Sequence, residues 1–256
     1  MSPTFRDSLS RDVPMLTLRS LLFTTYLFLF AFVGGAVELL IFWAPHRWQW
    51  AVASAWAHGN LWAGRFFCGL DVVTEGAENL PDRASVAMIK HTTAMETYWQ
   101  IAALPAQTWV LKKELLMIPL FGWGVGLVMK PIAIDRKAGA SAVKQVIEQG
   151  RNRIERGLWL TIFPEGTRVP PGQTQRYGIS GAAVAVETGC PVVPVAHNAG
   201  DFWPKRGLRK YPGRIRFCIG PPIDPAGRTP KEINALAQEW IENKMREISA
   251  LYKEQK

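Results

Sequence analysis

Two short motifs in this chain carry the residue types needed for acid–base chemistry. In the first, His91 follows the apolar run at residues 85–90, and Glu96 lies a few residues further on. A carboxylate bonded to one ring nitrogen of a histidine fixes the ring tautomer. It also stabilises the imidazolium that forms when the other nitrogen takes a proton. The chain has only four histidines, and a purely structural histidine is the competing interpretation of His91.

The second motif is the stretch Phe-Pro-Glu-Gly-Thr-Arg at residues 163–168, directly after the apolar run at 158–162. Pro164 and Gly166 predict a tight turn that presents Glu165 and Arg168 in a loop. A guanidinium binds phosphate in bidentate fashion, and a carboxylate accepts a hydrogen bond from a hydroxyl. An exposed ion pair of little energetic value is the competing interpretation.

Both motifs follow strand-like runs, and the ends of strands are where α/β folds place their sites. Helical patterns lie between several of these runs, one of them at residues 139–156. Thr229, Pro230 and Glu232 predict the capped start of a last helix. The predicted strands are 85–90, 108–111, 131–134, 158–163, 192–196 and 214–219. This alternation predicts an α/β fold with a central mixed sheet flanked by helices.

The N-terminal part is different in character. Residues 21–44 are almost continuously apolar, with Glu38 as the exception, and the run is long enough to span a bilayer as a helix. Residues 46–67 are rich in tryptophan, which is typical of a membrane–water interface. A cleaved signal peptide, a single span and an interfacial pair of helices are the alternatives, and we favour the pair anchored on one face. We therefore predict membrane-anchoring helices in residues 1–67 and a catalytic domain in residues 68–256.

Composition narrows the class of partner. The chain has 256 residues, of which 48% are hydrophobic, and a formal net charge of +9. Such an apolar chain is not disordered. Its basic residues are scattered and no nucleic-acid-binding motif is present, so the charge predicts an anionic membrane surface and no nucleic acid. The three cysteines form no disulfide framework, and no metal-binding spacing is present.

The motifs resemble those of the glycerolipid acyltransferase family, and most closely its 1-acylglycerol-3-phosphate acyltransferases. That family has four blocks in order, and each has a counterpart here. They are His91 to Glu96, Lys-Lys-Glu-Leu at 112–115 continuing to Ile-Asp-Arg at 134–136, Phe-Pro-Glu-Gly-Thr-Arg at 163–168, and Val-Pro-Val at 193–195. The family usually has Asp where this chain has Glu96, whose side chain is one methylene longer.

The resemblance implies direct acyl transfer. His91 would take the proton of the sn-2 hydroxyl of lysophosphatidic acid, Glu96 would support the imidazolium, and the oxygen would attack an acyl thioester. No acyl-enzyme is needed, and no Gly-x-Ser-x-Gly nucleophile elbow occurs. The implied substrate-binding residues are Arg168, Lys112 and Arg136 for the phosphate, Glu165 for the glycerol, and Gly166 and Thr167 in the same loop, with a backbone N–H near Gly166 as a candidate oxyanion donor.

The resemblance also implies the partners and the location. Acyl-coenzyme A or acyl-carrier protein would be the acyl donor, with no cofactor. Membrane lipids would be partners at the inner (cytoplasmic) membrane, with the catalytic domain facing the cytoplasm. The residues around 115–128 would line the acyl-chain path, unless they are ordinary core. Another lysolipid acceptor, a lipid hydrolase and an inactive membrane scaffold are the alternative functions.

Overall fold

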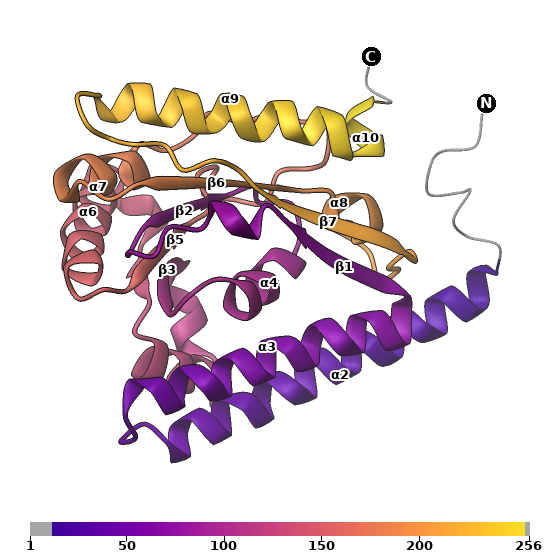
Figure 1. The fold of residues 1–256 in the computed structure, drawn as a ribbon. Helices are drawn as coiled ribbons and strands as arrows, with labels where there is room; N and C mark the ends of the chain where they lie inside the picture. The colour runs from indigo at the N-terminus through magenta and orange to yellow at the C-terminus, as the bar shows by residue number, and fades with distance from the viewer. Residues whose placement is uncertain (1–11, 254–256) are drawn as a thin grey trace.

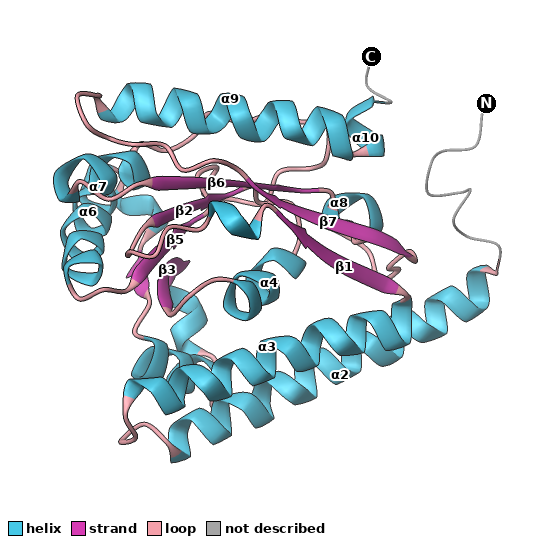
Figure 2. Ribbon diagram, viewed as in Figure 1, coloured by secondary structure: helices cyan, strands magenta, loops and turns pink. Residues whose placement is uncertain are grey.

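A mixed sheet with helices on both faces forms the body of the molecule (Figure 1, Figure 2). The computed structural model describes residues 12–253, apart from the side chains of Arg136 and Lys253. Its seven strands are ordered β1-β7-β6-β2-β5-β3-β4, and β6 and β7 are the only antiparallel neighbours in this described sheet. The strands are β1 (Leu70–Glu75), β2 (Val86–Ile89), β3 (Gln107–Lys112), β4 (Ile132–Ile134), β5 (Trp159–Ile162), β6 (Val192–His197) and β7 (Gly213–Ile219). The predicted mixed α/β fold is confirmed.

Helices connect the strands and cover the sheet. The longer ones are α2 (Val13–Leu40), α3 (His46–Cys68), α4 (Met95–Ala103), α6 (Ala140–Glu155), α7 (Ser180–Thr188) and α9 (Pro230–Ile248). The short ones are η1 (Ala77–Asn79), η2 (Lys113–Met117), α5 (Phe121–Gly124), η3 (Val125–Met129), η4 (Arg136–Ala138), α8 (Ala199–Phe202) and α10 (Ala250–Lys253).

The two faces of the sheet have separate hydrophobic cores. Helices α6, α7 and α9 cover one face, where Val146, Ala182 and Ile233 pack against the strands. Helices α2, α3 and α4 lie on the other face, where Phe23 and Trp99 belong to the second core. The N-terminal helices therefore share a core with the sheet that carries both motifs.

Local sequence signals explain where several elements begin. The predicted capping box at the start of α9 is confirmed, because Thr229 N–H donates to Glu232 Oε2 (2.7 Å) and Glu232 N–H donates to Thr229 Oγ1 (3.3 Å). The helix predicted at 139–156 is α6. Strand β1 was not predicted, since it is an edge strand in which Asp71 and Thr74 interrupt the apolar residues.

The first helix begins earlier than the apolar run suggested. Helix α2 starts at Val13, where Asp12 Oδ1 accepts a hydrogen bond from Met15 N–H (3.2 Å), and it ends at Leu40 rather than near Ala44. Three polar side chains in its first half have hydrogen-bond partners in the 208–212 loop, namely Thr17, Ser20 and Thr24. Ser20, for example, is fully buried and accepts from Lys210 N–H (2.9 Å).

Helices α2 and α3 form the predicted helical pair, joined by a short turn and lying side by side along one edge of the molecule (Figure 1). Among the described residues, α2 alone is long and apolar enough to cross a membrane. Most of its apolar side chains are exposed, as are several on α3 and on residues 115–127. Examples are Leu18, Leu22, Phe28, Leu29, Val33, Trp48, Trp62, Phe66, Met117, Trp123 and Leu127. The boundary at residue 67 and the depth of the pair in a membrane stay predictions.

Candidate active site

The two motifs meet at the carboxyl end of the parallel strands. The loop between β2 and α4 carries His91, and Glu96 lies in the first turn of α4. The chain turns back at residues 92–94, so His91 Nδ1 lies 2.8 Å from Glu96 Oε1. The structure therefore brings this predicted pair into direct contact.

Glu96 is held by a dense set of donors. Its Oε1 accepts from the N–H groups of Thr92 (2.8 Å) and Thr93 (2.7 Å), and its Oε2 accepts from Thr93 Oγ1 (2.5 Å). Burial alone would raise the pKa of Glu96, but the charge of His197, the bond and charge of His91 and the Thr93 bond lower it to about 2. The carboxylate is therefore ionised and fixed at neutral pH.

This contact sets the tautomer of His91. An ionised carboxylate only accepts hydrogen bonds, so Nδ1 carries the proton and Nε2 keeps its lone pair. Phe163 from the second motif stacks on the ring, with centroids 4.1 Å apart. Val169 N–H donates to the His91 carbonyl (2.8 Å). The two motifs thus hold one another, and His91 has the protonation pattern of a general base.

A cavity of about 480 Å³ opens beside His91. Its cationic lining residues are Lys112, Arg168 and Lys205, and Thr167 lies with them. Lys205 also donates through Nζ to the Arg168 carbonyl. Apolar residues form much of the remaining wall, among them Trp56, Ile101, Trp109, Leu116, Phe121 and Val125. The cavity can therefore hold an anionic group together with an aliphatic chain.

Other predicted site residues lie elsewhere. Gly166 does not line the cavity; its φ of +66° makes the turn, and its N–H donates to the Phe163 carbonyl (2.9 Å). That N–H is therefore engaged and is not a free oxyanion donor. Arg136 begins η4, and its side chain lies outside the described part of the chain.

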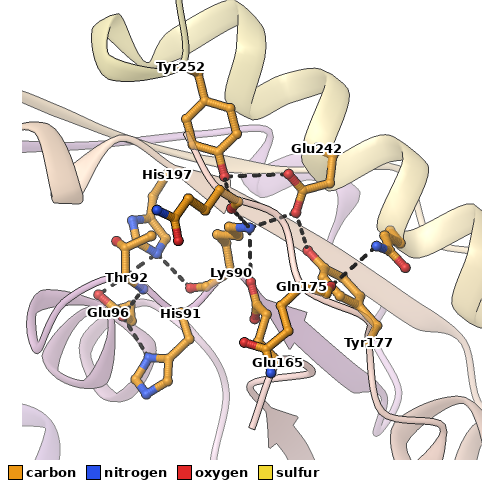
Figure 3. Close-up of polar contacts among 12 residues, drawn as sticks. Lys90, His91, Thr92, Glu96, Glu165, Gln175, Tyr177, His197, Glu242 and Tyr252 are labelled. Carbon is orange, nitrogen blue, oxygen red and sulfur yellow. Dashed lines mark hydrogen bonds and ion pairs between the residues drawn. The ribbon is translucent and has the colours of Figure 1, made fainter. Parts of the chain in front are cut away.

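Glu165 points away from the cavity, which argues against the predicted contact with the glycerol. Its Oε1 lies 3.1 Å from Nζ of Lys90, and both side chains are fully buried. Lys90 and His91 are consecutive at the end of a strand and so project to opposite sides (Figure 3). Glu165 therefore lies on the same side as Lys90, because a buried ammonium requires a counter-charge.

Lys90 is the centre of a buried polar cluster that the sequence did not reveal. Its Nζ also donates to Glu242 Oε1 of α9 (2.6 Å), which accepts from the Tyr177 hydroxyl too (3.1 Å) (Figure 3). Burial lowers the pKa of Lys90, but the charges of Glu165, Tyr252 and Glu242 outweigh it and raise that pKa. Burial raises the pKa of Glu165 to about 7. We call Lys90, Glu165, Tyr177, Glu242 and Tyr252 the Lys90 cluster.

His197, at the end of β6, contacts the backbone beside His91 from within the sheet. Its Nε2 donates to the Lys90 carbonyl (2.7 Å), and its Nδ1 accepts from Ala199 N–H (3.3 Å). Burial lowers the pKa of His197, and the charge of Glu96 opposes this effect. The two hydrogen bonds of the ring fix the backbone just before His91. No group of His, Cys, Asp and Glu in the described residues is arranged to hold a metal ion.

Comparison with known proteins agrees with this geometry. Residues 71–198, which include both motifs, match the family model described as Acyltransferase. The chain belongs to the acyltransferase family. A 1-acyl-sn-glycerol-3-phosphate acyltransferase of Pseudomonas aeruginosa is 40% identical over 242 residues, covering 91% of this chain and 93% of that protein.

More distant acyltransferases show the same relation. The human 1-acyl-sn-glycerol-3-phosphate acyltransferase alpha is 26% identical over 179 residues, which is 68% of this chain and 62% of the human protein. The crystal structure of the 1-acyl-sn-glycerophosphate (LPA) acyltransferase of Thermotoga maritima superposes with a TM-score of 0.75 at 23% identity. That match covers 90% of this chain and 94% of the Thermotoga chain and shows a shared fold.

Proposed function

We propose that this acyltransferase moves a fatty acyl group from an acyl thioester to the sn-2 hydroxyl of 1-acylglycerol-3-phosphate, giving phosphatidic acid. The observation that carries the proposal is the 2.8 Å contact between His91 Nδ1 and Glu96 at the wall of a cavity with cationic and apolar linings. The names of the Pseudomonas and human relatives support the same acceptor.

The chemistry needs one base and no covalent intermediate. Nε2 of His91 takes the proton of the acceptor hydroxyl as its oxygen attacks the thioester carbonyl. Glu96 stabilises the imidazolium. When the tetrahedral intermediate collapses, the carbon–sulfur bond breaks and the imidazolium returns its proton to the leaving thiolate. The enzyme is then ready for another cycle with His91 again neutral.

The cationic part of the cavity suits the acceptor phosphate. Arg168 offers a planar fork of donors, and Lys205 lies against the same loop. Lys112 is a further cationic candidate at the end of β3. The apolar part of the cavity suits an acyl chain, in line with the path predicted around residues 115–128. Arg136 stays a predicted contributor.

Glu165 acts in this proposal as a positioning residue. Its ion pair with Lys90 joins the 163–168 loop to the strand end that carries His91. Glu242 fastens the same lysine to α9 (Figure 3). The Lys90 cluster would therefore fix the distance between the base and Arg168 without touching either substrate.

The donor and the location are also proposals. Acyl-coenzyme A or acyl-carrier protein would supply the thioester, and the exposed apolar face of α2 and α3 would rest on the cytoplasmic side of the inner membrane. Lipid acceptors dissolved in that leaflet would then reach the cavity, which Gly34, Gly35 and Trp56 of the same helices help to line.

Labelled acyl transfer tests the function. Purified protein in detergent receives labelled palmitoyl-coenzyme A with lysophosphatidic acid, with lysophosphatidylcholine or with no acceptor. We expect labelled phosphatidic acid with the first mixture and its loss in His91→Ala. Product with lysophosphatidylcholine at an equal rate would reject the phosphate monoester as the specific acceptor. Free fatty acid without an acceptor would instead indicate a hydrolase.

A further inference from the structure

A second cavity lies near the turn between α2 and α3, and it is lined by basic residues. Its volume is about 280 Å³. The basic residues that line it are His46 at the start of α3, Lys130 after η3, and Arg153 and Arg156 at the end of α6. No acidic residue belongs to its lining, which is completed by Phe42, Ala44, Gln49, Val128, Met129 and Leu158. We call this the basic cavity.

The positive charges of the basic cavity are not neutralised within the described part of the chain. None of its four basic residues forms an ion pair with a described carboxylate. Nε of Arg153 is buried and has no hydrogen-bond partner among the described residues. Arg153 is half-buried, and the other three basic residues are exposed. Basic groups that lie close together disfavour one another's charged forms, and an anion between them opposes this effect.

Two of these groups have lowered pKa values, mainly because they are partly buried and in smaller part because of a neighbouring positive charge. Burial, and then the charge of Lys130, lowers the pKa of His46. Burial, and then the charge of Arg156, lowers the pKa of Arg153. A bound anion would oppose the effect of the neighbouring charge on both groups.

The backbone around the basic cavity is built to hold these groups in place. Lys130 has a left-handed φ of +45°, which is uncommon for a residue with a side chain. In this conformation its carbonyl accepts from Nη2 of Arg153 (3.2 Å) and from Thr108 Oγ1 (3.3 Å). Strained residues of this kind cluster at ligand sites. The long helix α3 also begins here, and its first turn has neither a side-chain cap nor an acidic residue, so its positive end adds to the field.

The surroundings indicate where the anion comes from. Leu40, Phe42 and Trp43, in the turn beside the basic cavity, are 73%, 56% and 75% exposed. Tryptophan and other large apolar side chains exposed beside basic groups are typical of the membrane interface, where lipid phosphates lie.

We propose that the basic cavity binds the phosphate of an anionic membrane phospholipid, apart from the catalytic cavity. The ligand chemistry is a phosphate ester, held by the guanidinium groups of Arg153 and Arg156 and by Lys130 and His46. Its occupation would anchor the turn between α2 and α3 to the lipid head groups. The site goes beyond the acyl-transfer reaction, because no residue of the catalytic pair belongs to it.

Short-chain lipids test this inference on the full-length protein. Binding of dioctanoyl-phosphatidylglycerol, kept below its micelle concentration, is measured by titration calorimetry in a fixed detergent. Dioctanoyl-phosphatidylcholine and inorganic phosphate are measured beside it. We expect saturable binding of the phosphatidylglycerol and weaker binding of the other two. Equal binding of phosphatidylcholine, or tighter binding of phosphate, would reject an anionic lipid as the ligand.

Three variants separate the basic cavity from general surface charge. Arg153→Gln with Arg156→Gln should weaken phosphatidylglycerol binding by about tenfold or more, since two charge-assisted bonds are lost. The matched control, Arg228→Gln with Lys231→Gln at the start of α9, removes the same charge from an exposed site and should change the affinity less than about twofold. Ala44→Leu fills the basic cavity without changing charge and should also weaken binding. Equal losses in both charge pairs, or full binding by Ala44→Leu, would overturn the proposal.

Discussion

The contact between Glu96 and His91 allows a quantitative prediction for Glu96→Gln. Glutamine is isosteric with glutamate, and its Oε1 can keep accepting from the N–H groups of Thr92 and Thr93. The change therefore removes the negative charge and leaves the shape of the site. Any effect on the reaction should come from the loss of charge beside the imidazolium.

The magnitude follows from the geometry. Glu96 Oε1 lies 2.8 Å from His91 Nδ1, so the charge centres are separated by roughly 4 Å. At an effective dielectric constant of about 20, such a pair is worth about 4 kcal/mol. If the imidazolium is largely formed in the transition state, kcat should fall by about 10³-fold, since each 1.36 kcal/mol is a factor of ten.

Stability should change as well. The pKa of Glu96 is lowered to about 2 from an ordinary value of 4.5. A carboxyl group with a lowered pKa stabilises the folded state above pH 4.5, and this contribution is lost as the pH falls towards 2. Glu96→Gln should therefore lower the free energy of unfolding by about 3 kcal/mol at pH 7. The difference between the two proteins should shrink towards pH 2.

The assay combines acyl-transfer rates at saturating substrates with urea unfolding from pH 7 to pH 3. Glu96→Asp serves as the matched variant, because it keeps the charge but draws the carboxylate back by one methylene. Its rate should lie between those of the wild type and Glu96→Gln. A kcat for Glu96→Gln within about threefold of the wild type would refute the reasoning, since the charge would then contribute less than 1 kcal/mol to the transition state.

Three further predictions concern the Lys90 cluster and the cavity beside His91. Lys90→Met leaves two buried carboxyl groups without their cation and should lower the free energy of unfolding by about 3–5 kcal/mol. Combining it with Glu165→Gln and Glu242→Gln should restore part of the lost stability, as measured by thermal unfolding. An unchanged stability of Lys90→Met would contradict a structural role for this lysine. Arg168→Gln should raise KM for lysophosphatidic acid about 10–100-fold with a smaller change in kcat, whereas Arg228→Gln should leave KM unchanged in the same initial-rate assay; an unaltered KM in Arg168→Gln would remove that residue from the phosphate site. Ala31→Phe narrows the catalytic cavity and should shift the preference among acyl-coenzyme A donors towards shorter chains, which competition between lauroyl and palmitoyl donors would measure; an unchanged ratio would place the acyl chain elsewhere.

The sequence predicts the active site where the chemistry is local. His91 and Glu96 are close along the chain, and an apolar strand precedes each motif, so their meeting at the edge of the sheet follows from α/β topology. The capped start of α9 is also local and was predicted residue by residue. The sequence predicted that Glu165 and Arg168 would face the same ligand. In the structure the turn at Gly166 separates them, so that Arg168 lines the cavity and Glu165 pairs with the buried Lys90.

The buried partners of Lys90 come from distant parts of the chain. Glu242 accepts a hydrogen bond from Lys90 across 152 residues of sequence, and it lies between Ile241 and Asn243 with no local signal that a glutamate there is buried. The polar residues early in α2 likewise have distant partners, since Lys210 N–H donates to Ser20 across 190 residues of sequence. The basic cavity joins three segments in the same way. Such tertiary contacts explain why local patterns missed these features.

The central claim is that His91 acts as the base for direct transfer to the lipid hydroxyl. The most direct measurement is the rate of labelled phosphatidic acid formation by His91→Ala, with thermal unfolding as a check on the fold. We predict a loss of at least about 10³-fold in kcat with no labelled acyl-enzyme in either protein. A rate near that of the wild type, or a labelled acyl-enzyme that turns over, would contradict the mechanism.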